Sequence, residues 1–251
     1  MRPTLRLAST LALFASLVLI FERASADGPD EGWVDLSKLS AWKGSTQGWS
    51  TVGNAKLDIK DPKRLAAEGG SGVICNGPTG KVPNLVTVED FGDVEVHLEF
   101  FLPKGSNSGI KFQGVYEIQL IDSHGVKVPK GTDSGGVYPR SEDKPKYHHI
   151  DGGHPPMVNA ALPAGQWQTL DAVFLAPRFD AEGNKVADAR ITATLNGRKV
   201  QDNLKVETPT GSAYRDKEKP TGPLLLQADH GPVAFRNIRA RRIETTTARQ
   251  P

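Results

Sequence analysis

The segment Tyr116–Asp122 contains the residues best suited to chemistry in this chain. In an extended strand, Ile118 and Leu120 lie on one face, and Glu117 and Gln119 lie on the other. With the apolar face packed inward, a carboxylate and an amide stand side by side on the outer face. Such a pair can bind sugar hydroxyls through planar hydrogen bonds. The pattern also fits two solvated residues without a function, and alternation alone favours this second interpretation.

A second acid–base candidate is Asp229-His230, which lies in a turn containing glycine. A histidine beside a carboxylate can donate or accept a proton near neutral pH, although these residues also suit a plain turn. Asp122 has the opposite parity to Glu117, so it joins that face only at a strand end, or it starts the following turn. Asn107 precedes a strand and suits either a tight turn or a polar site.

The long irregular region over 125–165 holds four residues with possible metal ligands: His148, His149, Asp151 and His154. Their spacing matches no closed zinc pattern, so a solvated loop is the preferred interpretation, and a divalent metal stays a second hypothesis. The sequence lacks the motifs of phosphate-binding loops, zinc proteases, serine-hydrolase elbows and dinucleotide sites, so no other cofactor is predicted. Cys75 lies in an apolar stretch, which indicates a buried structural thiol.

The elements that must position these residues are strands. Val94–Leu102 shows clear alternation, with branched and aromatic side chains on one face. Asn196-Gly197 separates two short strands and predicts a tight hairpin, because both central residues need a positive φ. A hairpin is predicted at 49–59, and strands at 108–113, 115–121, 167–176, 224–227 and 233–242. Many short antiparallel strands predict an all-β sandwich or jelly roll.

Residues 1–26 are typical of a secretory signal peptide and are excluded from the fold. Arg2 and Arg6 begin a positive segment, an apolar run follows, and Ala24-Ser25-Ala26 offers a cleavage site. The apolar run is short for a membrane span. The mature protein is therefore expected to be periplasmic or secreted, with no stable membrane span.

One β-sandwich domain is predicted over residues 32–243, followed by a disordered tail at 244–251. The domain is long enough to bury one core. The 26 glycines and 18 prolines suit short strands joined by turns. The formal net charge of +2 is close to balance and gives no reason to expect a nucleic-acid partner.

Several short motifs occur in an order that carries a family resemblance. They are Asn107-Ser-Gly-Ile110, Tyr116-Glu-Ile-Gln119 with Asp122, Gly135-Gly-Val-Tyr138, Pro155-Pro-Met-Val-Asn-Ala160, Gly165-Gln-Trp167, Ala176-Pro-Arg-Phe-Asp180, Asn196-Gly197, Gln227-Ala-Asp-His-Gly231 and Phe235-Arg-Asn-Ile238. No single motif is specific. Together, their order and spacing resemble the 3-keto-disaccharide hydrolase domain family over residues 32–243.

The resemblance implies a concanavalin-like jelly roll that cleaves carbohydrate substrates oxidised at C3 of the sugar. A C3 ketone acidifies the C2 proton, so a base can remove it, the C1 substituent can leave by elimination, and water can add back. One base and a group that stabilises the enolate oxygen suffice, unlike the paired carboxylates of ordinary glycosidases. At the matching positions, Glu117 is the first choice for catalytic carboxylate, and His230 with Asp229 is the second acid–base candidate.

The resemblance also implies residues that bind sugar oxygens. These are Asn107, Gln119, Asp122, Tyr138, Asn159 and Gln227, with Asp122 also a candidate metal ligand. Pro139–His154 departs from the family pattern as an insertion that could reshape the substrate entrance. A non-catalytic carbohydrate-binding module is the alternative function, and a structural cell-surface protein is a third. A catalytic site requires Glu117 and His230 to approach one pocket, whereas a module requires a shallow groove with exposed tryptophan or tyrosine.

Overall fold

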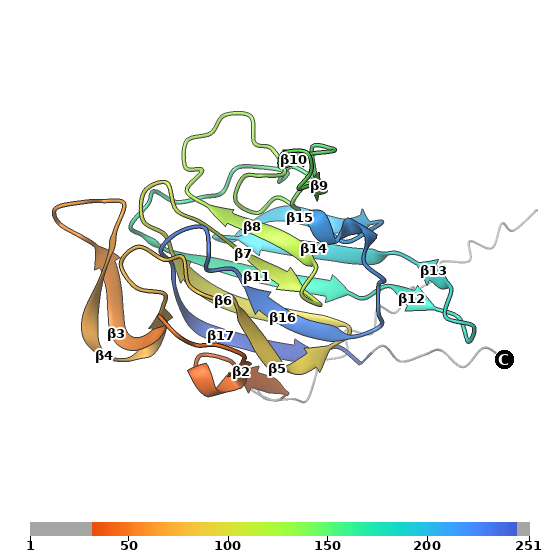
Figure 1. The fold of residues 1–251 in the computed structure, drawn as a ribbon, viewed down its shortest axis with the longest axis horizontal. Coiled ribbons are helices and arrows are strands. Elements are labelled where there is room, and N and C mark those ends of the chain that lie inside the picture. The colour runs from red at the N-terminus through yellow and green to blue at the C-terminus, as the bar shows by residue number, and fades with distance from the viewer. Residues whose placement is uncertain (1–31, 245–251) are drawn as a thin grey trace, which may run out of the picture. The chain divides into compact units, whose positions relative to one another are not determined.

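Residues 32–244 are described by the computed structural model, and they form two packed β-sheets (Figure 1). The expected signal peptide at 1–26 lies outside the described residues, as does the expected tail beyond residue 244. The helices in this part are two short 3-10 turns, η1 (Leu39–Ala41) and η2 (Ser212–Arg215). The predicted all-β jelly-roll sandwich is confirmed. Among residues 32–244, none of the helices has the length and apolar character needed to cross a membrane.

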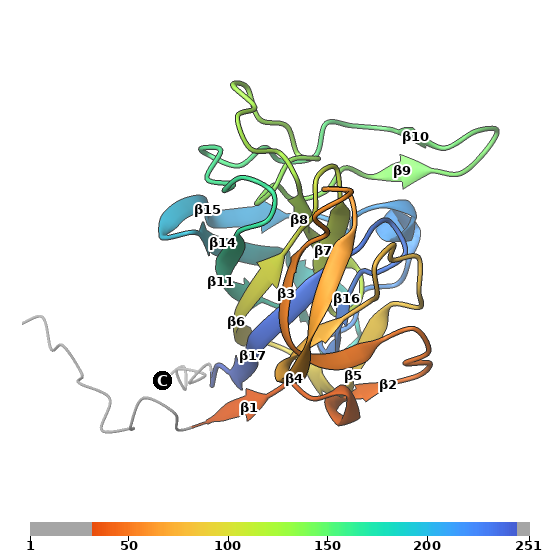
Figure 2. The same ribbon diagram turned by 90° about the vertical axis from the view of Figure 1, so that its left-hand side faces the viewer.

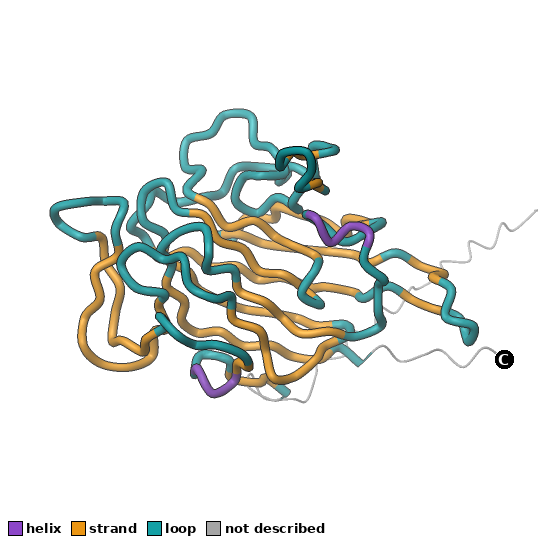
Figure 3. The backbone as a smooth tube through the Cα atoms, in the orientation of Figure 1, coloured by secondary structure: helices purple, strands orange, loops and turns teal. Residues whose placement is uncertain are grey.

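The larger sheet has eight strands. In spatial order it contains β15 (Arg198–Val206), β14 (Ala189–Leu195), β11 (Trp167–Leu175), β6 (Val94–Phe101), β17 (Ala234–Arg242), β4 (Leu65–Cys75) and β3 (Ser50–Leu57), with β1 (Trp33–Asp35) also paired to β17. The pairs are antiparallel throughout. Figure 3 shows how strand dominates this layer, with loops gathered at its ends.

The smaller sheet has five strands and carries the polar residues of interest. Its order is β2 (Trp42–Lys43), β5 (Leu85–Phe91), β16 (Gly222–Leu226), β7 (Asn107–Phe112) and β8 (Tyr116–Ile121), so β8 is an edge strand. Two further strand pairs lie outside the sandwich: β9 (Ser141–Glu142) with β10 (His148–His149), and β12 (Arg178–Phe179) with β13 (Lys185–Ala187). Figure 2 shows the β9–β10 hairpin above β7 and β8.

The core between the sheets follows the alternation read from the sequence. Along β6, Val94, Val96, Leu98 and Phe100 are all buried. From the smaller sheet, the inward residues of β7 and β8 join the same core; they are Ile110, Phe112, Tyr116, Ile118 and Leu120. The two layers are therefore held together by apolar side chains that point away from the outer face of β7 and β8.

The local predictions have mixed outcomes. The hairpin at Asn196-Gly197 is confirmed, with φ of 50° and 75° at the two central residues. The hairpin predicted at 49–59 is wrong, because β3 is one continuous strand whose partner is β4. Cys75 is buried, with its sulfur 3.3 Å from the Ser50 hydroxyl.

Candidate active site

The polar residues of β7 and β8 meet on the outer face of the smaller sheet. The two strands pair with Lys111 opposite Glu117 and Gly109 opposite Gln119. Because paired residues in an antiparallel sheet point to the same face, these four residues project together, away from the core. The alternation predicted for Glu117 and Gln119 is therefore present. Neither residue is solvated, however, since each is only 2% exposed.

A pocket of about 380 Å³ covers this face. That volume lies within the range of about 300–1,000 Å³ for small-molecule sites. Seven of the residues singled out from the sequence line it: Asn107, Glu117, Gln119, Tyr138, Gln227, Asp229 and His230. The remaining lining residues are Asn84, Lys111, Ser141, Tyr147, Gly211 and Ser212.

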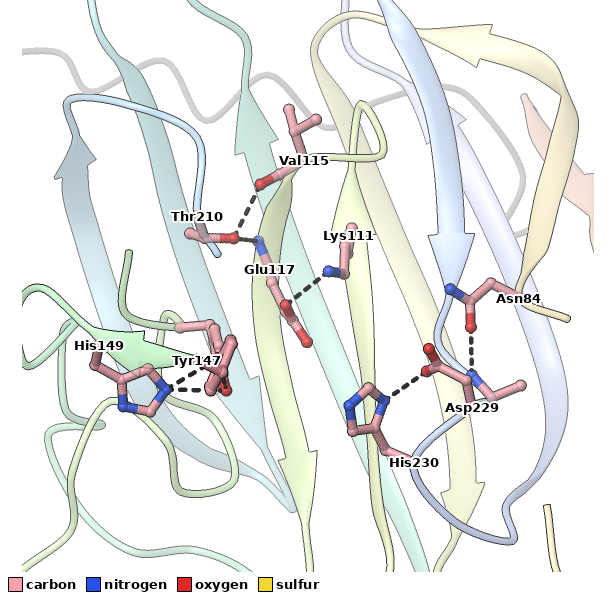
Figure 4. A network of polar contacts seen from close by, with 11 residues as sticks. Asn84, Lys111, Val115, Glu117, Tyr147, His149, Thr210, Asp229 and His230 are labelled. Atoms are coloured by element: carbon pink, nitrogen blue, oxygen red, sulfur yellow. Dashed lines mark hydrogen bonds and ion pairs between the residues drawn. The ribbon is translucent and has the colours of Figure 1, made fainter. Parts of the chain in front are cut away.

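Glu117 occupies the centre of the pocket, paired with Lys111 (Figure 4). The Lys111 ammonium nitrogen lies 3.0 Å from the Glu117 carboxylate. Burial raises the pKa of the Glu117 carboxyl, while the charges of Lys111 and His230 oppose that rise and Asp229 adds to it. A buried carboxylate that is ionised is a stronger base than an exposed one. When ionised, Glu117 is therefore a stronger base than an exposed carboxylate, and the adjacent Lys111 ammonium favours that ionised form.

Gly109 makes room for this carboxylate. A methyl group on Gly109 would meet the Glu117 carboxylate oxygen Oε1 at 2.5 Å, far inside van der Waals contact. We expect Gly109→Ala to displace the carboxylate and to lower catalytic efficiency by about 10-fold or more, since misplacement near 1 Å costs up to about 100-fold.

The same variant should change stability little. The backbone of Gly109 is not in the left-handed conformation, so alanine fits the strand there without backbone strain. Steady-state kinetics and a thermal melt test this prediction. The matched comparison is Gly69→Ala on β4 of the larger sheet, where an added methyl group meets no atom within 4 Å. Equal activity of wild type and Gly109→Ala would contradict the prediction.

Three amide side chains that line the pocket have buried oxygens without a hydrogen-bond partner in the described part of the chain. They are Asn107 Oδ1, Gln119 Oε1 and Gln227 Oε1. A buried polar group left unpaired costs about 1–3 kcal/mol. Three such oxygens in one pocket are explained by a ligand with several donors, and sugar hydroxyls are donors of this kind.

Asp229 and His230 form one rim of the pocket. The carboxylate oxygen Oδ1 of Asp229 lies 2.6 Å from His230 Nδ1, and both side chains are about half exposed. This contact orients the imidazole. Asn84 supports the turn by accepting the Ala228 N–H at 2.8 Å. The dyad and Glu117 lie on the same pocket (Figure 4).

The open edge of β8 is covered, which fixes Glu117 and Gln119. Tyr138 N–H donates to the Glu117 carbonyl, and Gln119 N–H donates to the Gly136 carbonyl. The Glu117 N–H donates to the Thr210 hydroxyl at 3.1 Å. An edge strand with satisfied backbone groups holds its side chains in one position.

Two predicted site residues lie elsewhere. Asp122 accepts the Gly105 N–H at 2.9 Å and serves the turn beside β7. Asn159 donates to the carbonyls of Ser123 and Val126 and so shapes the long loop. Neither residue lines the pocket described above, because local backbone hydrogen bonds occupy their side chains.

The candidate metal ligands of the long loop form contacts with other residues and do not converge. His148 Nδ1 contacts the Lys146 carbonyl, and Asp151 pairs with Arg140 at 2.5 Å. His149 Nε2 lies near two tyrosine hydroxyls. Within residues 32–244, the structure contains no group of three or more histidine, cysteine, aspartate or glutamate side chains arranged to hold a metal ion.

Sequence reasoning missed Lys111, Asn84 and Tyr147. A signal existed for Lys111, since it lies in the strand predicted at 108–113 and shares the parity of Asn107 and Gly109. Asn84 and Tyr147 carried no such signal, because each reaches the pocket only through tertiary contacts.

Comparison with known proteins identifies the family. Residues 32–241 match the 3-keto-alpha-glucoside-1,2-lyase-like domain. The chain belongs to this family. The family predicted from the motif order is thus confirmed, and the match places the chain among carbohydrate-acting domains. No curated relative matches the chain in sequence.

Two solved structures of candidate glycosyl hydrolases from Parabacteroides distasonis share the fold of this lyase-like domain. The first is 23% identical over 81% of this chain and 84% of that chain, with a TM-score of 0.56. The second is 19% identical over 85% of this chain and 95% of that chain, with a TM-score of 0.55. At these identities the likeness shows the fold alone.

Proposed function

We propose that this protein is an exported enzyme that cleaves 3-keto-glycosides by elimination across C1 and C2, followed by hydration. The observation that carries the proposal is the grouping of Glu117, the Asp229-His230 dyad and three unpartnered amide oxygens on one pocket. Export rests on the signal peptide expected at residues 1–26.

The reaction begins with the C2 proton, which the C3 ketone makes acidic. Glu117 accepts this proton, and the electrons of the C–H bond form an enolate whose charge rests on the C3 oxygen. The C1–O bond then breaks, C1=C2 forms, and the departing oxygen takes a proton. Addition of one water across C1=C2 releases the free 3-keto sugar.

Two side chains are candidates to stabilise the enolate. The Lys111 ammonium is held beside Glu117, and the His230 imidazole is oriented by Asp229. Preorganised donors aimed at developing charge act strongly in a site from which water is largely removed. Asn107, Gln119 and Gln227 would orient the ring through its hydroxyls.

The test is incubation of the purified protein with 3-keto-trehalose and with a 4-nitrophenyl 3-keto-glucoside, followed by detection of released sugar or nitrophenol. The same glycosides with an ordinary C3 hydroxyl serve as matched controls. Release from the keto substrates alone supports the proposal. Sugar binding without release from any keto substrate would favour a binding module and overturn it.

The pH dependence follows from the environment of Glu117. Since burial raises its pKa, and the ionised form is the base, catalytic efficiency should fall as pH drops through a value above the ordinary glutamate range of about 4.3. In Lys111→Met the opposing charge is removed, so this acidic limb should move to still higher pH. A pH profile of kcat/KM, recorded for wild type and for Lys111→Met, measures the acidic limb of each protein. A limb that moves to lower pH in Lys111→Met would contradict the assignment.

A further inference from the structure

Tyr138 stands next to Glu117 in the same row of side chains across the site. Ile118 and Val137 form an antiparallel bridge, so the adjacent pair, Glu117 and Tyr138, shares the opposite face. The backbone contact from Tyr138 N–H to the Glu117 carbonyl, 3.1 Å, agrees with this placement. The row therefore runs from Tyr138 through Glu117 to Lys111.

The Tyr138 hydroxyl belongs to a compact cluster with Tyr147 and His149. Its oxygen lies 2.9 Å from the Tyr147 hydroxyl oxygen and 3.1 Å from His149 Nε2. Tyr147 Oη lies 3.2 Å from the same nitrogen. The His149 ring stands nearly perpendicular to both phenol rings, with interplanar angles of 89° and 80°. Tyr138 and Tyr147 both line the pocket, while His149 is exposed to solvent.

The phenol of Tyr138 keeps its proton. Burial, the hydrogen bond to Tyr147 and the charge of Glu117 all raise its pKa. A neutral hydroxyl beside a negative base can give a proton without competing with Glu117 for the C2 proton. The hydrogen bonds to Tyr147 and His149 hold the Tyr138 hydroxyl in one position.

The hairpin that supplies Tyr147 and His149 is anchored at its base. The Tyr214 hydroxyl donates to the Glu142 carboxylate at 2.6 Å, and Arg215 pairs with the same carboxylate. Arg140 pairs with Asp151 where the two strands of the hairpin join the rest of the chain. These contacts give the Pro139–His154 segment a fixed position beside the pocket.

The two sides of Glu117 differ in charge, which orients the substrate. Lys111 and the Asp229-His230 dyad lie on one side of Glu117, and Tyr147 lies on the other (Figure 4). Tyr138 is on the side away from Lys111, because β8 pairs with β7 along one edge and with the Val137 segment along the other. C2 is bonded to both C1 and C3, so a ring with its C2 proton at Glu117 directs C1 and C3 to opposite sides. The enolate charge at the C3 oxygen fits the side that carries the Lys111 ammonium, which leaves C1 and its leaving group facing the phenols.

We propose that Tyr138 is the catalytic acid that protonates the departing C1 oxygen, with Tyr147 and His149 as residues that position and reprotonate it. This role rests on the proposed elimination. As the C1–O bond breaks, its electrons stay on oxygen, which takes the Tyr138 proton. His149 then returns a proton from solvent to the phenolate. The C2 proton held by Glu117 leaves to solvent, so charge and protons balance.

The experiment compares wild type, Tyr138→Phe and His230→Asn on two 3-keto-glucosides. Nitrophenolate leaves without help, whereas methoxide is strongly basic and needs an acid. In Tyr138→Phe, kcat/KM should fall about 100-fold or more for the methyl glycoside and less than about 10-fold for the nitrophenyl glycoside. In His230→Asn the losses should be similar for both substrates.

Exchange of the C2 proton in D₂O separates acid loss from misfolding. Tyr138→Phe should still exchange C2–H of the methyl glycoside while releasing no methanol, because Glu117 remains intact. Equal losses on both substrates, absent exchange, or a leaving-group dependence in His230→Asn instead would overturn the assignment. A wild type that releases neither methanol nor nitrophenol would overturn the proposed elimination itself, and that result is visible before any variant is made.

Discussion

Glu117→Gln should reduce kcat/KM on 3-keto-glycosides by about 100- to 10,000-fold, the usual contribution of a positioned general base. Glutamine keeps the shape of the side chain but cannot accept the C2 proton. Because Glu117 fills the space above Gly109, an isosteric change should preserve the pocket. Steady-state kinetics and C2 deuterium exchange measure the loss. Turnover and exchange of the C2 proton should be lost together.

Stability should not fall in parallel with activity. A carboxyl whose pKa is raised on folding stabilises the protein at low pH, and this contribution is lost as pH rises through the raised pKa. The ionised form of Glu117 is therefore a cost to folding, which Gln removes, although Lys111 loses its partner. We expect the melting temperature of Glu117→Gln to equal or exceed that of wild type.

The control for this variant is Glu99→Gln. Glu99 lies on β6 of the larger sheet, where it pairs with Arg236, so the same chemical change occurs away from the pocket. Its activity should match wild type. Retained turnover in Glu117→Gln would refute the assignment of the base, while equal losses in both variants would point to a general defect.

Phe174→Ala should destabilise the protein by about 3–5 kcal/mol, the usual cost of removing a buried phenylalanine. Phe174 is fully buried on β11 and stacks on Phe112, with ring centroids 4.9 Å apart. Tyr116 packs on the same ring at 5.2 Å. Since Phe112 and Tyr116 end β7 and begin β8, this contact ties the larger sheet to the strands that carry Lys111 and Glu117.

Urea unfolding, followed by fluorescence, measures the loss. Because whole domains are stable by only about 5–15 kcal/mol, the effect should be a large shift of the midpoint. Phe179→Ala is the matched control, since Phe179 lies half-buried in the β12–β13 pair and should cost far less. A similar cost for both variants would contradict the inferred role of Phe174 in joining the sheets.

The regular strands were predictable because alternation is a local rule. Val94 to Phe100 alternate between polar and apolar positions, and the apolar ones are buried in the structure. β4 was missed because Leu65–Cys75 contains three glycines and a run of exposed residues, so no apolar face is visible in its sequence. Its pairing with β3 depends on contacts along both strands.

The sequence by itself determined that Glu117 and Gln119 share a face, because successive side chains of a strand point to opposite sides. The order of the motifs along the chain also indicated the family. Only the tertiary structure decided that this face is a buried pocket. Segments distant in sequence, including Tyr147 and the Asp229-His230 turn, converge on Glu117, and their packing removes the water that would otherwise solvate it. That loss of water raises the pKa of Glu117 and turns a surface carboxylate into a strong base.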